Sequence, residues 1–233
     1  DRLRQERFGR AVTETEVPEL KDGEILVRNQ FLSVEPAMRG WVSAVANYSQ
    51  PVGIGEVMRS FASGEVVASR HPGYAPGEKV TGMFGWQELA AVPASAVSRK
   101  VTETDLPLSA SLGGLGLNGL TAYFALLDVG QPRPGGTVVV STAAGSVGSA
   151  VGQIAKLMGC RTVGIAGGPD KVRQCLQDFG YDAAIDYKAG GDLGAALAAA
   201  APGGVDVYFD NTSGPVSDTV LAQLAVGARV VLC

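Results

Sequence analysis

Small residues at fixed spacing make residues 137–159 the segment best suited to chemistry. Ala143, Gly145 and Gly148 stand at the spacing of a G-x-G-x-x-G turn with alanine in the first place, and Gly152 follows four residues later. In such a turn the first small residue allows a tight bend, the second lets the backbone approach a pyrophosphate, and the third lets a helix pack closely on a strand. The spacing predicts a dinucleotide-binding turn; a glycine-rich turn without a ligand is the alternative.

The flanking sequence supplies the strand and the helix that this turn requires. Residues 138–140 are an apolar β-branched run, and the mostly small residues 141–148 follow it. An apolar helical pattern then takes over, at Val147, Val151, Ile154, Leu157 and Met158. A helix that begins here presents free N–H groups and the positive end of its dipole to a phosphate.

The next strand favours NADP(H) over NAD(H). An NAD site places an acidic side chain about 20 residues after the glycine turn, where it accepts a hydrogen bond from the ribose 2′-OH. Residues 161–166 are predicted to form that strand, and Gly167-Gly168 follow it without a carboxylate. The first acid, Asp170, stands beside Lys171 and close to Arg173, which suits a 2′-phosphate. A solvated Lys171 in the first turn of a helix is the alternative.

Two polar residues follow the next two predicted strands. Tyr187 ends the third strand and Asn211 follows the fourth, and the carboxyl ends of strands in such a sheet face the ligand crevice. We expect the Tyr187 hydroxyl to donate to the 2′-phosphate and the Asn211 amide to hold the nicotinamide ribose or carboxamide. A turn role without a ligand is equally compatible with either residue.

The sequence offers few groups for metal or nucleophilic chemistry. His71, in the turn RHPGY, is the single histidine, and the cysteines, Cys160, Cys175 and Cys233, have no C-x-x-C spacing. Catalytic zinc needs a cluster of ligands, and Ser-His-Asp or Cys-His chemistry needs a suitably placed histidine. We therefore predict no metal site, and the sequence assigns no catalytic residue.

The elements that position these residues fall into two predicted domains. Residues 1–110 form a mostly-β domain that begins with a charged surface segment, 1–12; its strands are expected at 24–36, 64–69, 78–84 and 87–93. Residues 111–233 alternate β and α, which predicts a doubly wound parallel sheet. Beyond the turn its elements are expected as a strand at 161–166, a helix at 172–179, a strand at 183–185, a helix at 193–200, a strand at 205–210, a helix from 215 to 227 and a strand at 229–233.

Composition favours a globular protein that binds a small molecule. The 233 residues are 46% hydrophobic and carry a net charge of −4, with scattered basic residues, which argues against a nucleic-acid partner. No apolar run reaches the roughly 20 residues that span a bilayer, and no signal segment opens the chain, so we expect a soluble cytoplasmic protein and no membrane partner. The absence of an initial methionine and the end at VVLC suggest part of a longer polypeptide.

Several segments together resemble one enzyme family. They are LSVEPAMRG (32–40), IGEVM (54–58), GLTAYFALLDVG (119–130), STAAGSVGSAVGQIAKLMGC (141–160) and YFDN (208–211). They resemble the zinc-independent medium-chain dehydrogenases/reductases, in particular NADP-dependent alkenal double-bond reductases of the prostaglandin reductase and curcumin reductase type. One departure from the family's D-P-Y-M-R-G motif matters: this chain reads Glu35-Pro36-Ala37-Met38-Arg39-Gly40, so the aromatic ring of the tyrosine is missing at Ala37, which leaves the substrate open.

The resemblance implies a GroES-like mostly-β domain followed by a Rossmann domain, and reduction of an enal or enone C=C bond by hydride transfer from NADPH to the β-carbon. By motif match it implies pyrophosphate contacts from Gly145, Ser146, Val147 and Gly148, 2′-phosphate contacts from Lys171 and Tyr187, and nicotinamide contacts from Asn211, the loop starting at Cys233 and, more weakly, Thr121. An NADPH quinone reductase and a non-catalytic NADPH sensor are the alternatives. The expected partner is a small-molecule enone or enal, with a homodimer as the candidate assembly.

Overall fold

The computed structural model describes residues 12–43 and 49–233, and the chain divides after Leu112 into two compact units. Of the charged segment expected at 1–12, all but Val12 lies outside the described residues. Val12 itself is exposed.

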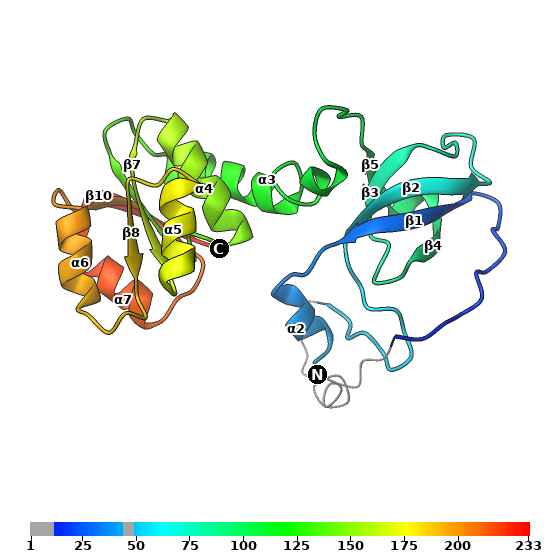
Figure 1. Ribbon diagram of the computed structural model, residues 1–233, viewed down its shortest axis with the longest axis horizontal. Helices are drawn as coiled ribbons and strands as arrows, with labels where there is room; N and C mark the ends of the chain where they lie inside the picture. Colours follow the sequence, from blue (N-terminus) through cyan, green and yellow to red (C-terminus); the bar gives the residue numbers. More distant parts are fainter. Residues whose placement is uncertain (1–11, 44–48) are drawn as a thin grey trace. The chain divides into compact units, whose positions relative to one another are not determined.

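The first unit is built on a five-stranded antiparallel sheet with the order β4-β1-β2-β3-β5 (Figure 1). Its strands are β1 (Glu24–Leu32), β2 (Ala62–Ser69), β3 (Lys79–Gly82), β4 (Leu89–Pro93) and β5 (Val97–Lys100). Alternate residues of β1, Ile25 and Val27, are fully buried, and Val66 and Phe84 complete the same core with them. This alternation is what a strand with one buried face produces.

The first unit also contains elements that the sequence did not predict. The short helix α2 (Ala37–Trp41) buries Met38 and Trp41, and β5 pairs with β3 although its residues are mostly polar. The 3₁₀ turns η1 (Ala94–Ala96) and η2 (Leu108–Ser111) complete the unit. β1 ends at Leu32, so its polar continuation to residue 36 is a loop.

The second unit is a doubly wound parallel sheet with the order β10-β9-β6-β7-β8. Its elements are α3 (Leu117–Phe124), the π-helix η3 (Ala125–Gly130), β6 (Thr137–Ser141), α4 (Ser146–Leu157), β7 (Arg161–Ala166), α5 (Pro169–Gln177), β8 (Ala183–Asp186), α6 (Leu193–Ala200), β9 (Val205–Asp210), α7 (Pro215–Leu221) and β10 (Leu224–Leu232). The predicted fold class, a mostly-β part followed by a doubly wound parallel sheet, is confirmed.

Helices cover both faces of this sheet because its central strand is apolar on both sides (Figure 1). Val138 and Val140 of β6 pack in one cluster with residues of α3, α4 and α5. Val139, between them, belongs to a second cluster with Leu197 of α6 and Val220 of α7. The continuous VVV run is therefore buried on two opposite faces.

The last helix is shorter than predicted. The sequence places Leu224 in a helix that continues to Gly227, but α7 ends at Leu221 and Leu224 begins β10, paired with Val205 of β9. The register of the pair shifts between Leu224 and Arg229, and Gly227, at φ +81°, lies within this irregular stretch. Pairing with β9 therefore determines the structure around Leu224, although the apolar residues there have helical spacing. Gly227 supplies a positive φ where the strand pairing is irregular.

The strand order places a reversal between β6 and β9. From β6 the chain proceeds outward through β7 to β8, and it then returns to the other side of β6 with β9 and β10. In parallel sheets of this kind the ligand crevice lies at the carboxyl ends of the strands beside such a reversal. Ser141 and Asp210 end the two strands concerned.

Candidate functional site

The turn after β6 is tight enough to require its glycine residues. Thr142 adopts a left-handed φ of +51°, and its carbonyl oxygen accepts a hydrogen bond from Gly145 N at 2.8 Å. A Cβ on Gly148 would lie 2.3 Å from the Thr142 carbonyl oxygen, and one on Gly145 would lie 2.8 Å from Thr142 Cγ2. Gly148 thus allows the start of α4 to pack directly on the turn, which is the packing that the spacing predicts.

The start of α4 presents three backbone donors. Gly145 is the N-cap residue, and the first intrahelical hydrogen bond runs from Ser149 N to Gly145 O at 2.9 Å. In the described chain, the N–H groups of Ser146, Val147 and Gly148 have no hydrogen-bond partner. Donors of this kind at the positive end of a 12-residue helix form a suitable phosphate site.

Tyr181, which the sequence reading missed, fixes this helix from the side. Its hydroxyl donates to Gly148 O at 2.6 Å, and a Cβ on Gly152 would lie 2.2 Å from its ring. The side chain is buried, and burial raises the pKa of its hydroxyl, so Tyr181 stays a neutral donor. Gly152 therefore serves the contact with Tyr181, and the lone tyrosine before β8 gives no sequence signal for this role.

Asn211 lies at the reversal between β6 and β9, as its position in the sequence predicts. Its backbone N–H donates to Ser141 Oγ and its side-chain Nδ2 donates to Ser141 O, both at 2.8 Å. The amide is therefore held in place by β6. Its Oδ1 has no partner within the described part of the chain and remains able to accept a hydrogen bond.

Asp210, the residue before Asn211, is the centre of a buried polar network that the sequence reading missed. Its side chain accepts hydrogen bonds from Ser217 Oγ at 2.7 Å, Tyr208 Oη at 3.0 Å, Ser141 Oγ at 3.2 Å, and the backbone N–H groups of Thr212 and Ser213 at 2.9 Å each. Burial opposes ionisation of Asp210, but these donors outweigh it and lower its pKa to about 2. The charged carboxylate thus shapes the loop that carries Asn211. The strand VDVYFD carries two acids, Asp206 and Asp210, and no local signal in the sequence shows that the second of them is the buried one.

The residues predicted for the 2′-phosphate follow the ends of the neighbouring strands β7 and β8. The exposed Lys171 is in the first turn of α5, and Tyr187 directly follows β8 with 46% of its surface exposed. A Cβ on Gly167 would lie 2.9 Å from the Tyr187 ring, so this ring lies against the turn between β7 and α5. Arg173 is instead paired with Asp170 at 2.5 Å.

One carboxylate joins these two strand ends. Asp186 Oδ1 accepts hydrogen bonds from Gly168 N at 2.8 Å and Lys188 N at 2.9 Å. These two donors lower the pKa of Asp186, so it is ionised at neutral pH. This oxygen atom therefore joins the turns after β7 and β8, together with the backbone hydrogen bond from Tyr187 N to Ala166 O at 3.2 Å.

Cys233 and Thr121, the other residues predicted for the nicotinamide, lie in different parts of the second unit. Cys233 is exposed, and its backbone N–H donates to Asp210 O at 2.9 Å, which places it beside Asn211 at the ends of β9 and β10. The Thr121 hydroxyl donates to Leu117 O within α3 at 2.7 Å, so it can act only as an acceptor while that bond persists.

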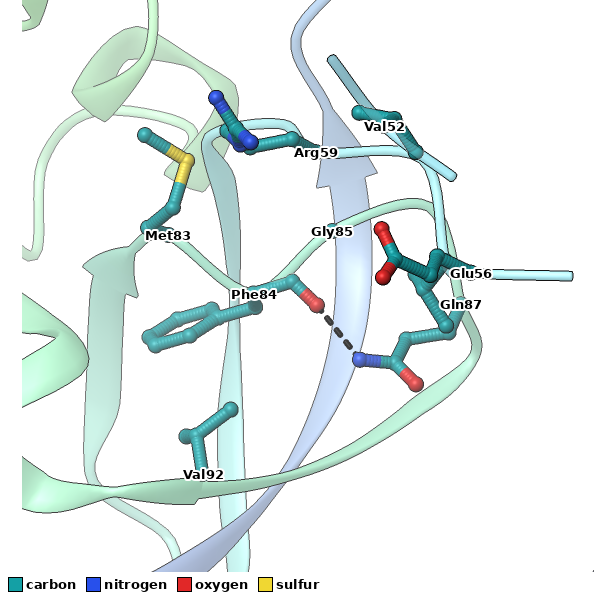
Figure 2. A pocket seen from close by; sticks show the side chains of 9 residues that line it. Val52, Glu56, Arg59, Met83, Phe84, Gly85, Gln87 and Val92 are labelled. Carbon is teal, nitrogen blue, oxygen red and sulfur yellow. Dashed lines mark hydrogen bonds between the residues drawn. The ribbon is translucent and has the colours of Figure 1, made fainter. Parts of the chain in front are cut away.

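A cavity of about 240 Å³ lies within the first unit (Figure 2). It is lined by Val52, Glu56, Val57, Arg59, Met83, Phe84, Gly85, Gln87 and Val92. The Gln87 amide is held by a 2.7 Å hydrogen bond from its Nε2 to Phe84 O, as Figure 2 shows. Apolar walls with a few oriented polar groups suit a small organic molecule.

The described residues contain no group of three or more His, Cys, Asp or Glu residues that could hold a metal ion. His71 lies in a turn, where its Nδ1 accepts a hydrogen bond from Gly73 N at 3.0 Å. Among residues 12–43 and 49–233, no helix is long and apolar enough to cross a membrane.

Comparison with known proteins gives matches along both units. Residues 3–100 match a family model described as the N-terminal domain of oxidoreductase, and residues 146–233 match one described as zinc-binding dehydrogenase. The chain is 48% identical over 217 residues to a putative NADP-dependent oxidoreductase, YfmJ, of Bacillus subtilis, covering 93% of this chain and 63% of the relative. It is 44% identical over 212 residues to an NADPH-dependent curcumin reductase of Escherichia coli, covering 91% of this chain and 61% of the relative.

A solved structure agrees with these sequence matches. The crystal structure of CurA in complex with NADPH from Vibrio vulnificus is similar with a TM-score of 0.86 and 42% identity, and the match covers 94% of this chain and 65% of that one. The chain therefore spans somewhat less than two thirds of the length of these relatives.

Proposed function

The chain belongs to the medium-chain dehydrogenase/reductase family, and from this premise we propose that it reduces the C=C bond of α,β-unsaturated aldehydes and ketones with NADPH. Relatives named as an NADPH-dependent curcumin reductase and a 2-alkenal reductase of Nicotiana tabacum support this reaction class. The geometry of the second unit supports the cofactor.

The observation that carries the proposal is the set of free donors at the start of α4. The N–H groups of Ser146, Val147 and Gly148 lie at the start of this helix, next to a turn that a Cβ at Gly148 would clash with. These residues, with Gly145, fit a pyrophosphate that approaches the backbone closely. We assign this part of the dinucleotide to them.

The 2′-phosphate and the nicotinamide, at the two ends of the cofactor, are assigned to residues that follow the neighbouring strands. Lys171 and Tyr187 would hold the 2′-phosphate, because the turn after β7 contains Gly167 and Gly168 in place of an acid. Asn211, fixed through Ser141, would accept from the nicotinamide side with its free Oδ1, next to Cys233. Thr121 is a weaker candidate for the same side.

The chemistry divides between cofactor and protein. NADPH, when bound, supplies a hydride to the β-carbon of the enone, and a proton from solvent or from a donor group is then added to the α-carbon. The protein binds and orients both reactants and excludes water. Asp210 contributes by holding Thr212 and Ser213, and with them the loop beside Asn211, in one conformation.

The cavity of the first unit is our candidate for the substrate. Val57, Met83 and Phe84 offer an apolar wall for the carbon chain, and Gln87 offers the amide N–H that does not bind Phe84 O as a donor for an oxygen atom. Arg59, which already donates to Ser49 and Gln50, and Glu56 are the charged residues of the lining. This assignment agrees with the reaction class, since an enal or enone is largely apolar with one polar carbonyl group.

Steady-state assays with NADPH and a panel of simple enals, enones and quinones test the proposal. Turnover of enals and enones is expected, with NADH a poorer reductant. A preference for quinones would favour the NADPH quinone reductase, which the same two units could support. Tight NADPH binding without turnover of any member of the panel would favour a sensor.

Two further parts of the proposal concern the protein's surroundings. We propose a cytoplasmic location, for which the three unpaired cysteines, Cys160, Cys175 and Cys233, are the supporting feature, because such thiols persist in a reducing compartment. We also propose a homodimer as the assembly. Cell fractionation and light scattering of the purified protein test these two statements.

A further inference from the structure

Lys188 is a cation at the predicted cofactor site to which no role has so far been assigned. It follows Tyr187 at the end of β8, and its backbone N–H is fixed by Asp186. Its side chain folds back over the turn after β7, because a Cβ on Gly167 would lie 2.9 Å from Lys188 Cε. Lys188 thus shares with Tyr187 the space that the missing side chain of Gly167 leaves open.

The ammonium group of Lys188 is available to an anion. Its Nζ lies 5.6 Å from the centre of the Tyr187 ring, and no carboxylate of the described residues lies within ion-pair distance of it. Asp186 is the nearest acid along the chain: the charge of Lys188 contributes to lowering its pKa, after the two backbone N–H groups on Oδ1, but the two side chains form no ion pair, so the ammonium group can still approach a phosphate. Arg173, by contrast, is neutralised by Asp170.

Resting on the NADPH dependence proposed above, we propose that Lys188 is a second specificity-determining residue: with Lys171 it binds the 2′-phosphate over Gly167. Two ammonium groups, one from the first turn of α5 and one from the turn after β8, would approach a dianionic phosphate from different elements, which a single lysine cannot do. Gly167 is part of this arrangement, because any side chain there would displace both the Tyr187 ring and the Lys188 stem.

Binding of two small nucleotides to the purified full-length protein tests this proposal without relying on turnover. Isothermal titration calorimetry compares 2′,5′-ADP, which carries the 2′-phosphate, with 5′-AMP, which lacks it. Lys188→Met is expected to weaken 2′,5′-ADP binding about tenfold or more and to change 5′-AMP binding less than about twofold. Lys188→Arg should retain most of the affinity, since a guanidinium also binds phosphate.

Two further variants make the experiment decisive. Lys171→Met should show the same selective loss, and Lys79→Met, which removes an exposed lysine of the first unit, should leave both affinities unchanged. Wild-type affinity for 2′,5′-ADP should fall with added salt more steeply than that of Lys188→Met, because one charge contact is missing from the variant.

The outcomes separate this inference from the proposed function. If Lys188→Met binds 2′,5′-ADP as tightly as wild type while Lys171→Met is impaired, Lys188 is a solvated side chain and the inference fails alone. Equal weakening of both nucleotides by Lys188→Met would also overturn it, because the role would then be structural. If wild type does not distinguish 2′,5′-ADP from 5′-AMP, the NADPH dependence and the inference fail together.

Discussion

NADPH and NADH differ by one phosphate, so single charged residues can decide between them. Lys171 is exposed in the first turn of α5, where the helix dipole disfavours a cation that has no anionic partner. Lys171→Ala is expected to weaken NADPH binding by about 1–3 kcal/mol and to leave NADH binding nearly unchanged. Fluorescence titration with each cofactor measures the two affinities. Equal losses for both cofactors would contradict a 2′-phosphate role for Lys171.

The buried Asp210 should make stability depend on pH in a defined direction. Its folded-state pKa of about 2 lies below the ordinary value of 3.8, so its stabilisation is present above about pH 4 and is lost as the pH falls towards 2. Asp210→Asn should unfold more easily at pH 7, by about 2–4 kcal/mol, because a neutral amide accepts more weakly from the N–H groups of Thr212 and Ser213 and replaces Oδ2, which accepts from Ser217 Oγ, with a donor.

Urea denaturation at pH 6 and pH 3 checks both parts of this prediction. The difference in unfolding free energy between wild type and Asp210→Asn should narrow by about 1 kcal/mol at pH 3, since only wild type loses the charge. Asp218→Asn, at an exposed position of α7 in the same unit, is the matched control. A difference that stays constant between the two pH values would show that the Asp210 network does not titrate as described.

The cavity of the first unit can be tested by filling it. Val57 lines this cavity and is half exposed, so a larger side chain there is expected to be accommodated without unfolding. Val57→Phe should lower kcat/KM for an enone about tenfold while the NADPH affinity stays within about twofold of wild type. Val12→Phe, at a position 98% exposed, is the control for added hydrophobic surface. An unchanged kcat/KM would place the substrate elsewhere.

At the scale of elements, the phosphate turn depends on how closely α4 packs on the end of β6. Gly148→Ala would place a methyl group 2.3 Å from the Thr142 carbonyl oxygen, and backbone cannot yield as a flexible side chain can. We expect a loss of about 1–3 kcal/mol in unfolding free energy and at least tenfold weaker NADPH binding, because the helix start must move. Gly203→Ala, where a Cβ meets nothing within 4 Å, should change neither quantity strongly. Wild-type NADPH affinity in Gly148→Ala would contradict the assignment of the pyrophosphate to this turn.

Elements with a strong local signal were predictable from sequence. The bounds of β7, α6 and β9 coincide with those predicted, because their apolar patterns end at glycine, proline or polar residues. The end of α7 was not predictable, since Leu224 fits the helical spacing and its pairing with Val205 is a non-local contact. The polar strand β5 was missed for the same reason, because its pairing with β3 outweighs its composition.

Some residues of the candidate site could likewise be predicted from the sequence, and others could not. Gly148 and Asn211 could be named from spacing and strand order, and the structure shows how α4 and Ser141 hold them. Tyr181 and Lys188 could not be named, because they contact Gly148 and Gly167, which are distant from them in sequence. Asp210 could not be singled out, because its strand carries a second acid, Asp206, and only the fold shows which of the two is buried. Short-range sequence patterns indicate where the backbone approaches a ligand. The side chains that hold this backbone in place can be identified only once the fold is known.

For the whole molecule, the residues proposed to bind the cofactor belong to the second unit, and the cavity lined in part by Arg59 and Gln87 belongs to the first. The second unit alone supplies the turn, the lysines and the loop at the reversal of the sheet. If the proposed assignments hold, cofactor binding is a property of the parallel sheet, and the antiparallel sheet contributes to substrate choice.

Hydrogen exchange with and without NADPH tests that division across the chain. Binding slows exchange where it satisfies or covers backbone N–H groups, so protection is expected in residues 145–149, in the turn 167–171 and in the loop 211–213. The core strands of the first unit, β1 and β2, should exchange at unchanged rates, because their N–H groups are already paired in the sheet. NADH should protect residues 145–149 in the same way but protect residues 167–171 less, because it has no 2′-phosphate. Protection of β1 and β2 without protection of residues 145–149 would place the cofactor in the first unit and would contradict the site proposed above.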